Sequence, residues 1–217
     1  MKQKLQFTVV LLIFVIFLGV VAVRERMQRT DIEFPKALDT VVVTVDDKEL
    51  LLKDLAFYIA YQEGKIEEEA RVYNPEDTGE YWRLHTNDVF LREAGKQKVI
   101  DMAVHDEIFY QLALAEGIEL TEEEEEHLAN DQYDFWSDLE EDQREGLGVS
   151  EDVIKESMRK LALAEKYQSL LSAMYDSEME SYSIGGQAYE RMLEEHTVTV
   201  DESIWDRVHF GGITLDH

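Results

Sequence analysis

The acidic run Glu122–Glu126, with His127 directly after it, is the densest group of potential metal ligands in the chain. Hard cations such as calcium take about six to eight oxygen ligands. Five consecutive acids on a helix fan around its axis, however, and cannot converge on one ion. Thr121 and Glu124 have the spacing of a helix capping box, and the helix dipole favours acids in a first turn. We therefore expect a solvated helix start and no metal site.

The triplet His105, Asp106 and Glu107 has the residue types of an acid–base site. Neighbouring helical positions point about 100° apart, so we do not expect these side chains to form one constellation. The spacing also differs from H-E-x-x-H, and no third metal ligand is indicated. A surface or packing histidine is the expected role of His105. The remaining histidines are scattered: His85, His127, His196, His209 and His217.

No motif for covalent or nucleotide chemistry occurs in the sequence. It lacks G-x-S-x-G, a Walker loop and a dinucleotide-binding glycine pattern. Zero cysteines exclude disulfides, thiolate nucleophiles, cysteine-bound zinc and iron–sulfur clusters. The formal charge of −27 argues against a nucleic-acid partner, which needs a basic surface. We expect no catalytic residue and no cofactor.

Aromatic side chains are the more informative group. Most are expected in the core, but large rings and methionines can also line an apolar cleft that binds many polypeptide sequences weakly. An acidic rim would keep such a cleft soluble and favour basic clients. The residues that we predict to bind clients are Tyr58, Tyr61, Tyr81, Trp82, Phe109, Tyr133 and Trp136.

Phe7–Val23 is a run of 17 residues in which Thr8 is the only polar member. As a helix it would be about 25 Å long, nearly enough for a hydrocarbon core of about 30 Å. A cleaved signal peptide has a shorter apolar region, of about 7–15 residues, and small residues at its cleavage site. We expect an uncleaved anchor within residues 1–29 that contacts the lipid bilayer through Phe7–Val23; a cleaved signal is the alternative.

Charge divides the chain near residue 30. Residues 1–29 carry five bases and one acid, whereas the rest of the chain carries 16 bases and 47 acids. The bases flank the apolar run almost equally on its two sides, so the positive-inside rule leaves the orientation open. The polar residues 30–39, interrupted by Pro35, are expected to form a tether.

The first element after the tether is predicted to be a β-hairpin. Thr40–Val45 is β-branched at every position and predicts a strand, Asp46 and Asp47 predict a turn, and Lys48–Leu50 predicts a short return strand. A hairpin of this size is marginal alone and must pack against another element.

The rest of the domain is predicted to be mainly helical. Asn74-Pro75 ends the first helix, Gly117 ends a central helix, and Gly146 and Gly148 separate the third helix from the fourth. Thr197–Val200 and Trp205–Leu215 are expected to be strand-like. The expected helices are 52–73, 87–116, 121–139, 150–175 and 186–195. The fourth helix carries an amphipathic stripe of Ile154, Met158, Leu161, Ala164, Tyr167, Leu171 and Met174.

This pattern resembles the N-terminal chaperone domain of SurA- and PrsA-type foldases. The segments that carry the resemblance are VVVTVDDKEL leading into LKDLAFYI, then LALAEGIELTEEEEE and LGVSEDVIKESM, in that order. The resemblance covers about residues 40–175. It implies a SurA-N-like helical chaperone domain at 40–180, followed by a C-terminal helix and strand-like extension at 181–217, on the outer side of the cell membrane.

Three features depart from the family. Leu51 replaces the usual Thr or Ser cap before the first helix, and no cysteine is present for a lipoprotein anchor. The chain also lacks a complete parvulin domain; only WDRVHFGGITL, with His209, resembles a parvulin first strand. The resemblance therefore implies chaperoning without isomerase activity.

The sequence thus predicts a membrane-anchored, extracytoplasmic holdase that binds unfolded or translocated polypeptides without catalytic chemistry. Two alternatives stay open. One is a parvulin-type peptidyl-prolyl isomerase of which these residues are the non-catalytic N-terminal part. The other is a membrane adaptor for one folded partner.

Overall fold

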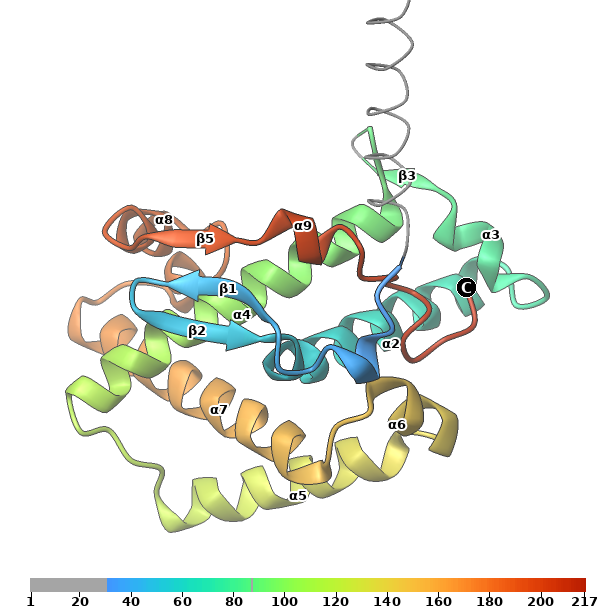
Figure 1. The fold of residues 1–217 in the computed structure, drawn as a ribbon. Coiled ribbons are helices and arrows are strands. Elements are labelled where there is room, and N and C mark those ends of the chain that lie inside the picture. The colour runs from blue at the N-terminus through green and yellow to red at the C-terminus, as the bar shows by residue number, and fades with distance from the viewer. Residues whose placement is uncertain (1–30, 87) are drawn as a thin grey trace, which may run out of the picture.

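The computed structural model describes residues 31–86 and 88–217. These residues form a mainly α-helical fold, as predicted, together with two small antiparallel sheets (Figure 1). The expected anchor, Phe7–Val23, lies outside the described residues, as does Asn87, the first residue of the expected helix 87–116. Within the described part of the chain, no helix has both the length and the apolar character needed to cross a membrane.

The predicted hairpin is present and belongs to a three-stranded sheet. β1 (Val41–Val45) pairs with β2 (Lys48–Leu51), and Asp46 turns the chain with a positive φ of 54°. β5 (Val198–Val200) pairs with the other edge of β1, so the strand order is β2-β1-β5. An irregularity in register between Val41 and Val43 accompanies the burial of two consecutive valines, Val42 and Val43.

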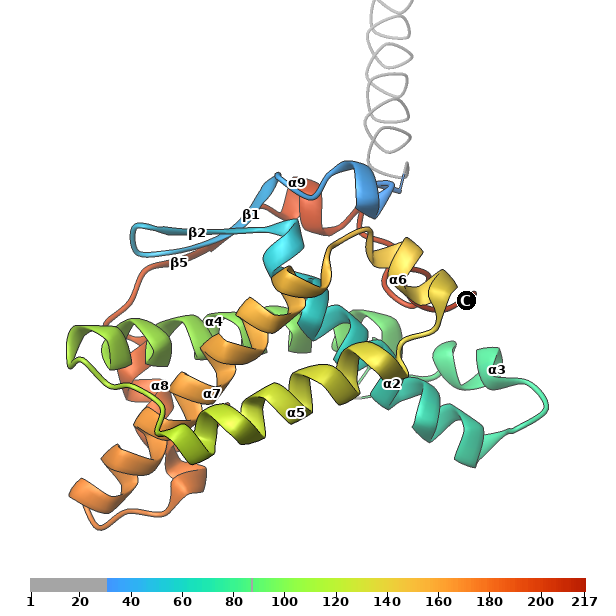
Figure 2. The same cartoon turned by 90° about the horizontal axis from the view of Figure 1, so that it is seen from below.

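The long helices lie on one face of this sheet (Figure 2). In chain order the helices and 3-10 turns are η1 (Phe34–Lys36), η2 (Leu52–Leu55), α2 (Ala56–Tyr73), α3 (Thr78–Trp82), α4 (Leu91–Ala115), α5 (Glu122–Asp138), α6 (Glu141–Leu147), α7 (Glu151–Met174), η3 (Met179–Tyr182), α8 (Gln187–Leu193) and α9 (Glu202–Trp205). β3 (His85–Thr86) and β4 (Val89–Phe90) form a second, two-stranded sheet before α4.

α4 is the central helix, as its apolar residues on several faces predict. It packs against α7, α2 and β1. Val99, Ile108 and Phe109 on α4 are almost completely buried. α5 packs against α7, and Figure 2 shows it on the outer side of that helix.

Local sequence signals predicted most helix ends. Asn74 follows the last residue of α2, and Gly117 and Gly148 take the left-handed conformation after α4 and α6. Thr121 accepts a hydrogen bond from the Glu124 amide, and the Glu124 carboxylate accepts one from the Thr121 amide, which completes the predicted capping box.

The structure differs from the prediction in several places. The described part of the predicted tether, residues 31–39, is packed into the fold: it contains η1, and Phe34 is buried. The sequence did not indicate α6 or the β3–β4 pair. Gly146 lies inside α6; it allows a close approach, because a Cβ there would lie 1.8 Å from the Ile213 carbonyl oxygen. Trp205–Leu215 contains no strand among the described residues; it is the end of α9 and an irregular segment with one bridge, between Ile32 and Val208.

A buried carboxylate holds this irregular C-terminal segment on α2. Glu63 accepts hydrogen bonds from the Gly211 amide at 2.5 Å, the Thr214 amide at 2.7 Å and the Thr214 hydroxyl at 2.5 Å. Burial raises the pKa of Glu63, although the hydrogen bonds from Thr214 and Gly211 act in the opposite direction. Phe210 is fully buried beside Trp82, with its ring at the position where Gly95 has no side chain.

Glu63→Ala tests this connection. The substitution leaves buried amide and hydroxyl donors without acceptors, and each unsatisfied buried group costs about 1–3 kcal/mol. We expect the free energy of unfolding to fall by about 3–5 kcal/mol. Denaturant unfolding of Glu68→Ala, an exposed position on the same helix, is the control. Equal stabilities of the two variants would contradict the role of Glu63.

Glu124 makes the stability depend on pH. Its hydrogen bond from Lys166, and then that from the Thr121 amide, lower its pKa to about 2. Because the folded pKa lies below the unfolded one, the stabilisation is present above about pH 4.5 and is lost as the pH falls toward 2. We expect the wild type to be more stable than Glu124→Gln at pH 6 and the difference to vanish near pH 2. A Glu123→Gln control should show no such convergence.

Candidate functional site

An open groove lies between the C-terminal halves of α4 and α7 and the η3–α8 segment. Its volume is about 650 Å³. We call it the α7–α8 groove. It is lined by Leu112, Tyr167, Leu171, Tyr175, Ser177, Ser181, Tyr182, Ala188, Arg191, Met192 and Glu195. The lining thus combines aliphatic side chains, one methionine and three tyrosines with a few polar groups.

The amphipathic stripe of α7 places one wall of this groove. Ile154, Met158 and Ala164 are buried against the other helices. Toward the end of α7 the same stripe becomes accessible: Leu171 is half-buried, and Met174 is exposed. The stripe therefore extends beyond the elements that cover it, and its last turns face the groove.

An aromatic cluster supports the floor of the groove. Phe109 of α4 lies within ring-contact distance of Tyr167, Tyr182 and Tyr189, with centroid separations of 6.1–6.5 Å. The Tyr167 hydroxyl donates to Glu116 at 2.7 Å. Burial, and then this hydrogen bond, raise the pKa of Tyr167 to about 12, so its hydroxyl stays protonated at neutral pH.

His105 fastens the η3–α8 wall to α4. Its Nε2 lies 3.0 Å from the Tyr182 carbonyl oxygen, and its Nδ1 lies 2.9 Å from Asp106 Oδ1. Both ring nitrogens of this buried histidine thus have an oxygen within hydrogen-bond distance. Its ring also packs against Tyr189 with a centroid distance of 4.8 Å.

His105, Asp106 and Glu107 were expected to form no single constellation; His105 and Asp106 do interact, whereas Glu107 bonds to Lys160 and Gln111. His105 has the predicted packing role. His105 and Asp106 can interact because α4 has neighbours on several sides, so adjacent helix positions both face the interior. Tyr58 donates to Asp106 Oδ2 at 3.0 Å. Burial, and then Asp106, raise the pKa of Tyr58 well above its usual range.

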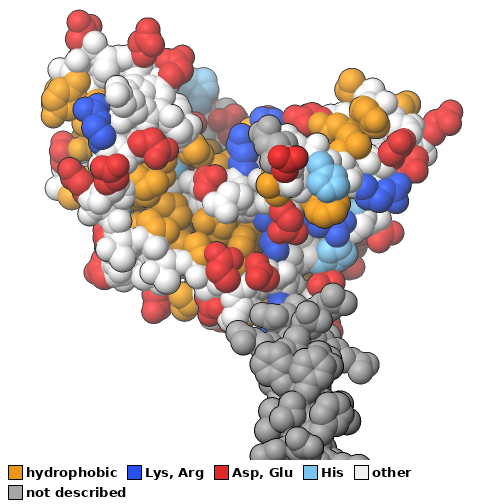
Figure 3. All heavy atoms as spheres, turned by 90° about the horizontal axis from the view of Figure 1, so that it is seen from above, with side chains coloured by type: hydrophobic (Ala, Val, Ile, Leu, Met, Phe, Trp, Pro, Cys, Tyr) orange, Lys and Arg blue, Asp and Glu red, His pale blue; other side chains and the backbone are white. Residues whose placement is uncertain are grey.

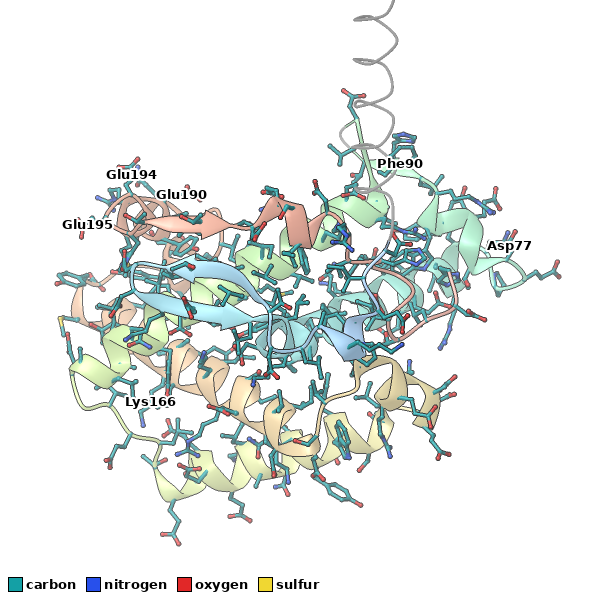
Figure 4. The ribbon with its side chains drawn as sticks, in the orientation of Figure 1. Asp77, Phe90, Lys166, Glu190, Glu194 and Glu195 are labelled. Carbon is teal, nitrogen blue, oxygen red and sulfur yellow. The ribbon has the colours of Figure 1, made fainter. Side chains whose placement is uncertain are left out.

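One acidic and one basic side chain, Glu195 and Arg191, belong to the groove lining. Glu190 and Glu194 project from α8 and its end close to Glu195 (Figure 4). The Ser177 hydroxyl is buried at the edge of the groove and has no hydrogen-bond partner among the described residues. The groove therefore offers mainly apolar contacts, with two opposite charges in its lining and further acids on α8.

The structure does not bring the predicted client-binding residues together. Tyr58, Trp82 and Phe109 are buried in the core and present no surface, so we leave them out of the candidate site. Trp82 donates to Glu67 at 3.0 Å and packs beside Phe210. Burial of these rings follows from tertiary packing, which residue type alone does not reveal.

The remaining four predicted residues lie outside the groove lining. Tyr61 is exposed on α2 and stacks on Phe57 with a centroid distance of 6.2 Å. Tyr81 and Trp136 are half-buried, the latter under the Arg144 guanidinium. Tyr133 is 68% exposed on α5.

The sequence did not predict the groove residues, because most large aromatic residues lie in the first three helices and their loop. The available signal was the α7 stripe, which continues through Tyr167, Leu171 and Met174 to the helix end. The short helix after it adds Tyr189 and Met192. On the face seen in Figure 3, apolar side chains gather in a hollow with acidic ones around it.

No side-chain cluster of the described residues suggests a metal centre: none brings together three or more histidines or carboxylates able to hold an ion. Glu124 and Glu125 are instead paired with Lys166 and Arg159. The acidic run is thus a helix start with ion pairs to α7.

Comparison with known proteins does not assign the chain to a family. No family model matches the chain, and neither the curated proteins nor the solved structures contain a match.

His105→Ala tests the connection between α4 and the η3–α8 wall. It leaves the buried Tyr182 carbonyl and the Asp106 carboxylate without this partner, and we expect a loss of about 2–4 kcal/mol in unfolding free energy. Hydrogen exchange should increase first in residues 177–193, next to the lost bond. His127→Ala, at an exposed position on α5, is the control and should change neither quantity. Unchanged exchange in 177–193 would contradict the assignment.

Proposed function

We propose that the chain is a membrane-anchored, extracytoplasmic holdase that binds unfolded or translocated polypeptides in the α7–α8 groove without covalent chemistry. The observation that carries the proposal is the groove itself. Its lining of leucine, methionine and tyrosine side chains can adapt to many apolar sequences. Clefts of several hundred Å³ with few polar groups are typical binding sites.

The order of elements supports a SurA-N-like fold within this proposal. A strand pair leads directly into α2, the long α4 ends at Gly117, and α5 and α7 follow with the boundaries that the family pattern predicts. The finer family assignment rests on this order and on the sequence segments quoted above.

Charge defines the clients that this site would prefer. The chain has 48 acids and 21 bases, Glu195 is part of the groove lining, and Glu190 and Glu194 are further acids of α8 and its end. A negative rim attracts basic segments and raises their rate of encounter at low ionic strength. The preferred client is therefore an extended segment with apolar anchors and flanking Lys or Arg.

Localisation is part of the proposal and rests on the sequence. Phe7–Val23 would anchor the chain in the bilayer, and the acidic residues after it would lie on the extracytoplasmic side.

A tyrosine pair on two helices provides a matched test. Tyr175 in the groove and Tyr133 on α5 are 66% and 68% exposed. In the full chain held in nanodiscs, Tyr175→Asp should reduce suppression of client aggregation by at least about threefold, because it places a charge among the apolar contacts. Tyr133→Asp should behave like the wild type.

Photo-crosslinking from position 192 identifies what the groove holds. A holdase gives many client adducts with apolar and basic segments. A single folded adduct would favour the adaptor, and prolyl isomerisation above background would favour the isomerase. Equal activity of the Tyr175 and Tyr133 variants would exclude the groove as the client site.

A further inference from the structure

The β3–β4 hairpin exposes apolar side chains at a distance from the α7–α8 groove. Leu84, Val89 and Phe90 are 36%, 45% and 53% exposed, and all three lie within seven residues of the chain. Figure 4 shows Phe90 and the α8 acids at separate ends of the molecule. A local group of exposed apolar side chains marks an interaction surface.

The charge near this hairpin differs from that of the chain as a whole. Between Arg83 and Lys98 the sequence has four bases and two acids, whereas the chain after residue 29 has 16 bases and 47 acids. Lys96 is buried, so Arg83, Arg92 and Lys98 are the accessible bases of this segment. The acids are Asp88 and Glu93, and Asp77 lies 3.6 Å from Arg83. Figure 3 shows basic, histidine, acidic and apolar side chains together on one of two lobes. This is the composition that suits an anionic surface.

Contacts connect the hairpin to the first described residue. Asp31 Oδ2 lies 3.8 Å from His209 Nδ1, and Arg92 donates to His209 Nε2 at 2.9 Å. Arg92 is the second residue of α4, whose cap position is Phe90. Ile32 is held to the same region by its hydrogen bond to Arg207. His209 and Arg92 thus link Asp31, the first described residue, to the start of α4, which directly follows the hairpin.

The length of chain before this point limits the distance to a bilayer. Residues 24–30, seven in number, separate Phe7–Val23 from Asp31. Fully extended, they reach at most about 25 Å. With Phe7–Val23 in the membrane, the Asp31 end of the domain lies within that distance of the bilayer surface.

We propose that the β3–β4 hairpin docks on the bilayer surface, with Leu84, Val89 and Phe90 in the headgroup region of anionic lipids. The inference rests on the anchoring that is part of the proposed function. Docking gives the domain a second, weak attachment, since apolar burial and basic side chains together favour an anionic interface. It also holds the domain in one orientation relative to the membrane, with the α7–α8 groove away from the attachment.

Single cysteines test the proposal, because the chain has none of its own. The full chain carrying Val89→Cys is labelled with the fluorophore NBD and placed in vesicles of phosphatidylcholine and phosphatidylglycerol. Lipids with a headgroup spin label should quench position 89 at least about twofold more than the same label at Tyr133→Cys on α5. Leu84→Cys is a second probe of the same surface.

The outcomes distinguish docking of the hairpin on the bilayer from anchoring of the chain through Phe7–Val23. Equal quenching at positions 89 and 133, in protein that floats with the vesicles, overturns docking and leaves the anchor intact. Blue-shifted emission at 89 without lipid quenching means that another protein copy covers the hairpin, and it also overturns docking. Protein that does not float overturns both.

Discussion

The arrangement of the C-terminal segment depends on the hydrogen bonds that the buried Glu63 carboxylate accepts from it. A single buried carboxylate on α2 accepts hydrogen bonds from residues 148 and 151 positions later in the chain. The segment that it holds carries Phe210 into the core and reaches Gly146 of α6. Because burying a carboxylate is costly unless it is well hydrogen-bonded, this geometry tolerates little displacement. The position of α6 and of the segment after α9 therefore depends on Glu63 as well as on apolar contacts.

A second buried polar connection plays the same role in the C-terminal half of α4. There His105 and Asp106 join Tyr58 of α2 to the backbone of Tyr182, which belongs to the wall of the α7–α8 groove. The groove is thus supported from behind by a hydrogen-bonded network and an aromatic cluster, whereas its open side is lined by half-buried apolar side chains. A rigid floor with an adaptable lining suits a site that accepts varied sequences.

Local signals explain which parts of the fold the sequence predicts. Asn74-Pro75, Gly117 and the Thr121 box act on neighbouring residues, and the elements that they delimit are found. The end of the chain has strand-like composition, but its conformation is decided by Glu63, which no local pattern indicates. The same limit applies to the site: Phe109 and Tyr175 are both aromatic, and only the packing of α7 and α8 around them makes the first a support and the second a surface.

The pairing of β5 with β1 has a consequence for the order of folding. Val43 and Val200 are partners across more than 150 residues, whereas the packed helix pairs α2–α4, α4–α7 and α5–α7 join segments that are closer in the sequence. Pairings of such high contact order are slow, and the free edge of β1 can meanwhile pair with other chains. A chain that emerges N-terminus first, from a ribosome or a translocation pore, leaves this edge open until residues 198–200 have appeared. The helices can therefore pack against one another early in folding, whereas β5 pairs with β1 last.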